Sequence, residues 1–222
     1  MTWNRVSGVV VGGCLLVACS GGGQVDVGDG AFKAEVWADN WFSLAVGETT
    51  VGEDSVPITT ERSFNQETFA FDGAYPLVLN FTAKDYKEND TGLEYIGENN
   101  QQMGDGGFIA QITDTSTGAV LAVTNSTWRC LVIHRAPTNP ECESSANPES
   151  ECLSEISEEP TGWKTADYDF SAWPNALEYT EQEVGTKDGY DEVSWDSSAH
   201  LIWSESLTQD NTLLCKLIVS AP

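Results

Sequence analysis

The chain has little positive charge, and this shortage limits what it can bind. Lysine and arginine together number 10, against 35 aspartates and glutamates, which gives a formal net charge of −25. Nucleic acid is excluded as a partner, because its phosphates are neutralised by basic stripes that this chain lacks. The same balance argues against docking on an anionic membrane through protein charge. It favours solubility, cation binding or a salty environment, where screening weakens self-repulsion.

The chain also lacks the motifs that mark common catalytic and metal sites. It has no G-x-S-x-G elbow, no H-E-x-x-H pair, no phosphate-binding glycine loop and no C-x-x-C pair. The two histidines, His134 and His200, have no serine or cysteine partner that the sequence identifies. We therefore expect a protein that is not an enzyme and has no zinc site. A glycosidase with paired carboxylates stays an alternative, because 35 acidic residues leave any pair undecided without geometry.

The first residues have the pattern of an export signal. Arg5 precedes an apolar run over residues 6–17, and a small residue, Ala18, stands before Cys19. The run is shorter than the roughly 20 residues that a helix needs to cross a bilayer. We therefore expect residues 1–18 to be a signal peptide and the mature chain to be exported.

The sequence LVAC at residues 16–19 resembles the lipobox of bacterial lipoproteins. The resemblance implies that Cys19 becomes the lipidated first residue of a membrane-anchored chain. Ser20, the residue after this cysteine, resembles the sorting signal of lipoproteins that are sent to the outer membrane. The expected location is therefore the bacterial outer membrane or cell surface. Residues 19–30 are rich in glycine and predict a flexible tether. A soluble secreted protein with a cysteine near its cleavage site is the alternative.

Beyond the tether, apolar residues alternate with a period of two, which is typical of β-strands. Such runs occur at 32–36, 42–46, 77–81, 108–112, 200–203 and 213–219. Residues 114–118 have the composition of a hairpin turn, and no segment has the pattern of a long amphipathic helix. The pattern predicts an all-β sandwich over residues 31–222. A segment rich in Pro, Glu, Ser and Asn predicts a long surface loop at 136–162.

Four cysteines follow Cys19 in the chain. An even number in an exported protein suggests two disulfides. Cys142 and Cys152 are near neighbours in the predicted loop, whereas Cys130 and Cys215 belong to apolar strand segments. We therefore predict the disulfides Cys142–Cys152 and Cys130–Cys215.

The segment 37–41 combines aromatic rings with hydrogen-bonding side chains. Sugars stack their apolar faces on rings, while carboxylates and amides bind their hydroxyls. The candidate ligand-binding residues are Trp37, Asp39, Asn40 and Trp41, with Trp163 and Trp173 as the second choice. Alternatively, a turn at residues 39–40 sends the two rings apart and leaves one of them in the core.

Oxygen-bearing side chains also suit a hard cation, which makes calcium the candidate cofactor. The candidate metal ligands are Asp39, Asn40, Asp105 and Asp210. The sequence contains no D-x-D-x-D-G loop, so this prediction rests on residue type alone.

The order of several short motifs resembles the galactose-binding-domain-like jelly rolls that serve as carbohydrate-binding modules. The motifs are ADNWFSL at 38–44, STWR at 126–129, GW at 162–163, DFSAW at 169–173, AHLIW at 199–203 and LCK at 214–216. The first motif departs from the family pattern, because residues 45–47 replace its tyrosine-led end. The resemblance covers about residues 31–222.

The resemblance implies a jelly-roll β-sandwich whose partner is a carbohydrate or a cell-surface glycan, bound without catalysis. A fold of this kind does not fix the function. One alternative is a structural or adhesive surface protein that binds another protein. The other is an accessory or catalytic domain of a glycosidase.

Overall fold

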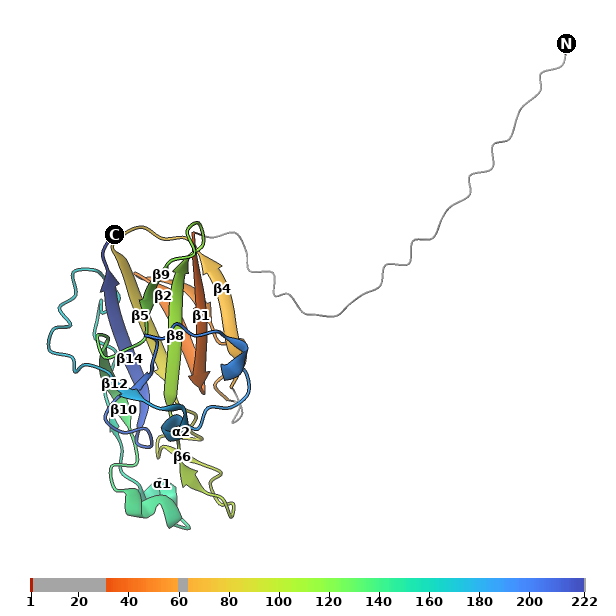
Figure 1. The fold of residues 1–222 in the computed structure, drawn as a ribbon. Helices are drawn as coiled ribbons and strands as arrows, with labels where there is room; N and C mark the ends of the chain where they lie inside the picture. The colour runs from red at the N-terminus through yellow and green to blue at the C-terminus, as the bar shows by residue number, and fades with distance from the viewer. Residues whose placement is uncertain (2–30, 60–63, 222) are drawn as a thin grey trace.

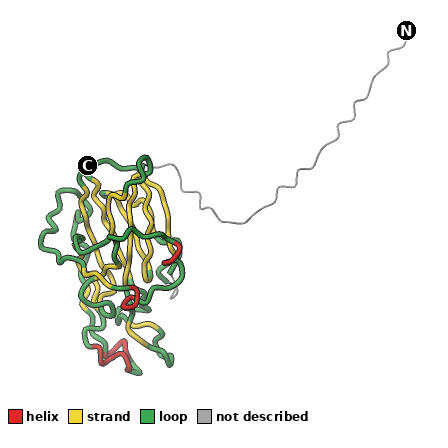
Figure 2. The backbone as a smooth tube through the Cα atoms, in the orientation of Figure 1, coloured by secondary structure: helices red, strands yellow, loops and turns green. Residues whose placement is uncertain are grey.

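The computed structural model describes Met1 and residues 31–59 and 64–221. These residues form an all-β structure of two antiparallel sheets with short helices in the connections (Figures 1 and 2). The predicted export signal and the lipidation site Cys19 lie outside the described residues. Among the residues that the structure describes, no helix is long and apolar enough to cross a membrane.

Sheet A has the strand order β12 (Leu177–Tyr179), β13 (Leu201–Trp203), β8 (Gly107–Asp114), β1 (Phe32–Asp39) and β4 (Gln66–Phe71), and β9 (Val120–Val123) pairs with β8. Sheet B has the order β11 (Glu155–Ile156), β10 (Arg129–Arg135), β14 (Asp210–Val219), β5 (Leu77–Lys84), β2 (Trp41–Val46) and β3 (Thr49–Glu53). A small third sheet contains β6 (Leu93–Glu94) and β7 (Gln102–Met103). The helices are η1 (Pro140–Ser144), α1 (Pro148–Glu151), α2 (Glu181–Val184) and η2 (Tyr190–Glu192). The six alternating runs and the hairpin turn of the sequence all fall on or beside these strands, which confirms the all-β prediction.

The main core lies between the two sheets. Alternate residues of each strand point inward, so Phe81 of β5 meets Phe108 of β8 with their ring centroids 5.2 Å apart. Both side chains are fully buried. Burial of one such ring contributes about 1.5–3 kcal/mol, and many apolar side chains of both sheets add to it. The period-two pattern therefore packs the two sheets against each other.

Both predicted disulfides are present. Cys130 and Cys215 face each other across the neighbouring strands β10 and β14. Cys142 and Cys152 close a short loop with a sequence separation of 10. The segment predicted as a surface loop at 136–162 is not free of regular structure, because it contains η1, α1 and β11.

The chain passes from sheet A to sheet B where β1 ends. Asp39 is the last residue of β1, the peptide bond between Asp39 and Asn40 is cis, and Trp41 begins β2. The end of β5 and the start of β8 lie at this same end of the sandwich, at the bottom of Figure 1. The connections that carry α2 and β6 also gather there, so this end is built of loops from distant parts of the chain.

Candidate functional site

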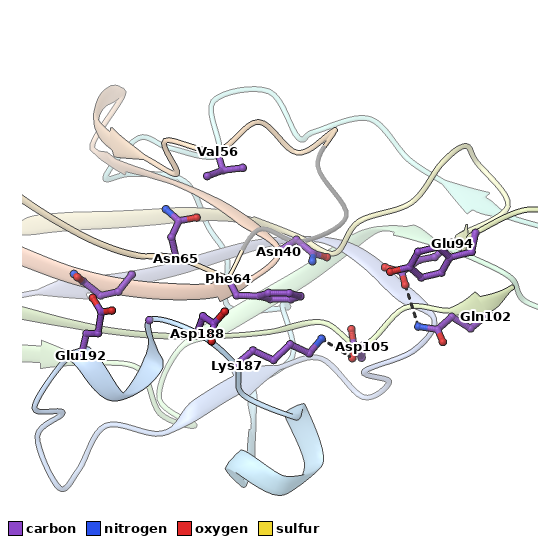
Figure 3. Close-up of a pocket in the computed structure, with 13 residues that line it drawn as sticks. Asn40, Val56, Phe64, Asn65, Glu94, Gln102, Asp105, Lys187, Asp188 and Glu192 are labelled. Carbon is purple, nitrogen blue, oxygen red and sulfur yellow. Dashed lines mark hydrogen bonds and ion pairs between the residues drawn. The ribbon is translucent and has the colours of Figure 1, made fainter. Parts of the chain in front are cut away.

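A pocket of about 730 Å³ lies at the loop-bearing end of the sandwich (Figure 3). Its lining consists of amides, carboxylates, one ammonium group, two aromatic rings and two small residues: Asn40, Val56, Phe64, Asn65, Gln66, Glu94, Tyr95, Gln102, Asp105, Lys187, Asp188, Gly189 and Glu192. The rings of Phe64 and Tyr95 are half-buried. The pocket therefore offers many hydrogen-bonding groups beside two partly accessible ring surfaces.

Asn40 is the one predicted ligand-binding residue of segment 37–41 that lines the pocket. Its backbone N–H donates to the carbonyl of Lys84 at 3.0 Å. Its side-chain oxygen accepts a hydrogen bond from the backbone N–H of Tyr86. Asn40 thereby ties the end of β1 to the end of β5 and holds that wall of the pocket in place.

Trp37 belongs to the core, which makes its prediction as a ligand-binding residue wrong. Its side chain is fully buried, and its indole N–H donates to the carbonyls of Phe64 at 2.9 Å and Asp188 at 3.1 Å. Trp41 lies on the other sheet, half-buried, with the Lys84 ammonium 4.9 Å from its ring centroid. The turn at residues 39–40 therefore sends the rings apart and leaves one in the core.

The second-choice tryptophans are also core residues, so they present no stacking surface. Trp163 and Trp173 are 3% and 6% exposed, and their rings pack together on Leu214 of sheet B. Lys216 lies beneath them and donates 3.0 Å hydrogen bonds to the side-chain oxygen of Asn80 and to two backbone carbonyls. No tryptophan among the described residues is exposed.

The four predicted metal ligands do not come together. Asp210 is fully buried, and its carboxylate accepts hydrogen bonds from the Arg135 guanidinium and from Ser204. These donors satisfy it, so its prediction as a calcium ligand is wrong. The side-chain oxygen of Asn40 is likewise committed to Tyr86. Asp39 and Asp105 do approach a common point, because the Lys187 ammonium is 3.6 Å from a carboxylate oxygen of each.

Beneath the pocket, four carboxylates influence one another electrostatically. We call this group the acidic cluster; it consists of Asp39, Asp85, Glu94 and Asp105. Asp39 is fully buried and Asp85 is 2% exposed. Both carboxylate oxygens of Asp39, and both of Asp85, have no hydrogen-bond partner among the described residues. As the side chains stand, no three acidic, histidine or cysteine residues of the described part are arranged to hold a metal ion.

Burial raises the pKa of Asp39 well above its ordinary value, and the neighbouring Asp105 charge raises it further. The Lys187 ammonium opposes this effect. Burial also raises the pKa of Asp85, followed by the charges of Asp39 and of Glu94. The backbone N–H of Asp105 counteracts this shift, although its geometry falls short of a hydrogen bond. The cluster thus disfavours its own ionised form.

Sequence reasoning missed Asp85 and Glu94, although one signal for Asp85 was available. The inward residues of β5 are Leu77, Leu79, Phe81 and Ala83. Continuing that alternation places Asp85 inward as well, which is unusual for a carboxylate. Glu94 has no comparable signal, because it lies in a strand of two residues.

Comparisons with protein-family profiles, with curated proteins and with solved structures found no match.

Proposed function

We propose that the chain is an exported lipoprotein, anchored through Cys19, whose jelly-roll sandwich of the galactose-binding-domain-like type binds carbohydrate without catalysis. The two disulfides support the export, because such bonds persist in oxidising compartments. β1 begins at the end of the sandwich opposite the pocket (Figure 1). An anchor upstream of residue 31 would therefore be attached at the end of the sandwich that does not carry the pocket.

The observation that supports carbohydrate as the ligand is the lining of the pocket. Its volume of about 730 Å³ is that of a small-molecule site. Amides and carboxylates, such as Gln102 and Asp105, match the hydroxyls of a sugar (Figure 3). The half-buried Phe64 ring, which has the Lys187 ammonium 4.1 Å from its centroid, contributes a further apolar surface beside these groups. Since no described tryptophan is exposed, the ligand we propose is a glycan end that enters the pocket.

A glycan array probed with the purified protein tests this proposal. A hit is then titrated against two matched variants that each lose one exposed amide. Gln102→Ala removes an amide of the pocket and is expected to weaken binding about 5–10-fold, the worth of one hydrogen bond. Gln182→Ala removes an exposed amide outside the pocket and should bind as the wild type does. Equal affinities of the two variants would place the ligand elsewhere.

The lipid anchor has its own test. Cys19→Ala should release the protein from the membrane fraction, and mass spectrometry of the wild type should show a lipid on Cys19. An unmodified mature Cys19 contradicts the lipoprotein part of the proposal and leaves the pocket part standing.

The burial of the tryptophans favours a second candidate function, a structural or adhesive protein that binds another protein. Five tryptophans of the described residues are buried: Trp37, Trp128, Trp163, Trp173 and Trp203. They leave no flat stacking face of the kind that binds polysaccharide surfaces. A glycan array without any hit favours this second candidate.

A further inference from the structure

Two buried carboxylates of the acidic cluster, those of Asp39 and Asp85, have no hydrogen-bond partner among the described residues. The Lys187 ammonium is the cation that the ion pairs bring to Asp39 and Asp105. Lys187 lies within ion-pair distance of Asp39 and Asp105, but no ion pair reaches Asp85 in the described part of the chain. Burying an unbalanced carboxylate is costly, because the charge loses its hydration and gains no partner.

Asp85 points into the cluster. A Cβ atom placed on Gly104 would lie 1.7 Å from its Oδ2 atom, so the carboxylate lies directly against the backbone that leads to Asp105. The charges that act on it most strongly are those of the other members of the cluster. Asp85 is 2% exposed and neither of its carboxylate oxygens has a hydrogen-bond partner among the described residues, so both oxygens are available to a cation.

The position of Lys187 indicates where a cation would lie. Its ammonium is 3.6 Å from one oxygen of Asp39 and 3.6 Å from one oxygen of Asp105. The side chain is 42% exposed, and its ammonium also lies 4.1 Å from the ring centroid of Phe64, so an ion that takes its place has to displace it towards solvent. A small ion there would be close to both carboxylates, and rotation of the Asp85 side chain would bring a third carboxylate to it.

We propose that the acidic cluster binds one calcium ion beneath the pocket, in competition with the ammonium of Lys187. Calcium suits a site made only of oxygen ligands with flexible geometry, whereas magnesium demands a near-ideal octahedron. The exterior of a cell is also where weak calcium sites are filled. The proposal goes beyond glycan binding: Asp39 and Asp85 lie outside the lining of the pocket, whereas Glu94 and Asp105 also line it.

The test is calorimetric titration of CaCl2 into the purified exported chain, stripped with EDTA and kept in detergent at pH 7. The expected dissociation constant is on the order of 10⁻⁴ to 10⁻³ M, as in extracellular calcium modules. Calcium should also raise the melting temperature, whereas MgCl2 at the same concentration should raise it less. Absence of binding heat together with an unchanged melting temperature overturns the proposal.

Four variants locate the site. Asp85→Asn and Asp105→Asn should each weaken calcium binding at least tenfold. The second serves if the first fails to fold, since the Asp105 side chain is 40% exposed. Asp210→Asn is the matched control, a buried aspartate changed in the same way but paired with Arg135, and it should keep the wild-type affinity.

Lys187→Met should tighten calcium binding several-fold, because it removes the competing ammonium. A general loss of fold cannot produce this increase in affinity. Weaker binding by Lys187→Met, or equal losses in the Asp210→Asn and Asp105→Asn variants, overturns the proposed site. Calcium is titrated here without any glycan, so a failure of calcium binding is distinguishable from a failure of glycan binding on the array, although Asp105 and Lys187 line the pocket as well.

Discussion

Two buried acidic regions of this molecule differ in how their charge is balanced. Asp210 receives two hydrogen bonds from Arg135, at 2.5 and 3.1 Å, and another from Ser204 at 2.6 Å. Asp39 and Asp85 are buried equally well, yet their oxygens accept no hydrogen bond from the described residues. Asp210 therefore has its donors among the described residues, whereas Asp39 and Asp85 have none there.

The difference indicates which region serves the fold and which serves a ligand. A buried carboxylate with its donors in place holds strands together, and removing it leaves other groups unpaired. A buried carboxylate without donors weakens the fold and is expected where a ligand compensates. Two members of the acidic cluster, Glu94 and Asp105, line the pocket, whereas Asp210 does not.

The largest effect on stability is expected from removing the Asp210 carboxylate, whose charge is paired with Arg135. Asp210→Ala removes the partner of Arg135 and of Ser204, and it should lower the free energy of unfolding by about 3–5 kcal/mol. Urea unfolding followed by tryptophan fluorescence measures this change. A loss below about 1 kcal/mol would mean that the pairing of Asp210 contributes no more than an exposed salt bridge.

The next effect concerns the buried cation Lys216, whose ammonium donates its hydrogen bonds to neutral oxygens. Lys216→Met removes hydrogen bonds to Asn80 and to the carbonyls of Trp163 and Thr165, and should cost about 2–4 kcal/mol. The loosened residues should include the buried Trp163 and Trp173, which near-ultraviolet circular dichroism reports. An unchanged spectrum would contradict this role.

The same variant reveals a pH dependence. Burial lowers the pKa of Lys216 from 10.5 to about 8, so the folded protein loses this proton before the unfolded chain does. Between about pH 8 and 10.5 the unfolded state binds more protons at this site, and stability therefore rises with pH. The wild type should gain about 2–3 kcal/mol relative to Lys216→Met across that window. Parallel stability curves for the two proteins would contradict the lowered pKa.

A smaller effect of opposite sign is expected from relieving the unbalanced region. In EDTA, Asp85→Asn removes a charge that folding has to bury, and it should raise the free energy of unfolding by about 1–2 kcal/mol. Thermal melts in EDTA compare it with the wild type. A destabilised variant would show that the Asp85 carboxylate has a partner that balances it.

The smallest effect is expected at Trp41. Its ring is half-buried and meets the Lys84 ammonium at 4.9 Å, so Trp41→Ala should cost about 1 kcal/mol. The fully buried Trp37 is the control, since truncating a buried tryptophan costs about 3–5 kcal/mol. Equal losses would mean that Trp41 also belongs to the core.

The sequence predicts the strands and disulfides well, because local alternation determines them. The alternation of β5 that includes Phe81 and the apolar run around Cys215 each indicate which side chains point into the core. The site is less predictable, because it forms from segments that meet only in the folded sandwich. Lys187 meets Asp39 and Asp105 from distant parts of the chain.

Residue type misled the prediction in two places. Trp37 has the chemistry of a sugar-binding ring, but its indole N–H finds buried carbonyls instead. Asp210 has the chemistry of a calcium ligand, but Arg135 satisfies it. The roles of both residues depend on partners that are distant in the sequence, and the sequence alone does not identify these partners.

Hydrogen–deuterium exchange of the full chain, in EDTA and in CaCl2, tests most directly whether the two acidic regions differ as described. Calcium should slow the exchange of backbone amides in residues 84–95, 102–107 and 185–189, which surround the acidic cluster. Exchange should stay unchanged in residues 129–135 and 201–206, which surround the Arg135–Asp210 pair. Unchanged exchange throughout, or equal slowing in both regions, would contradict a calcium site confined to the acidic cluster.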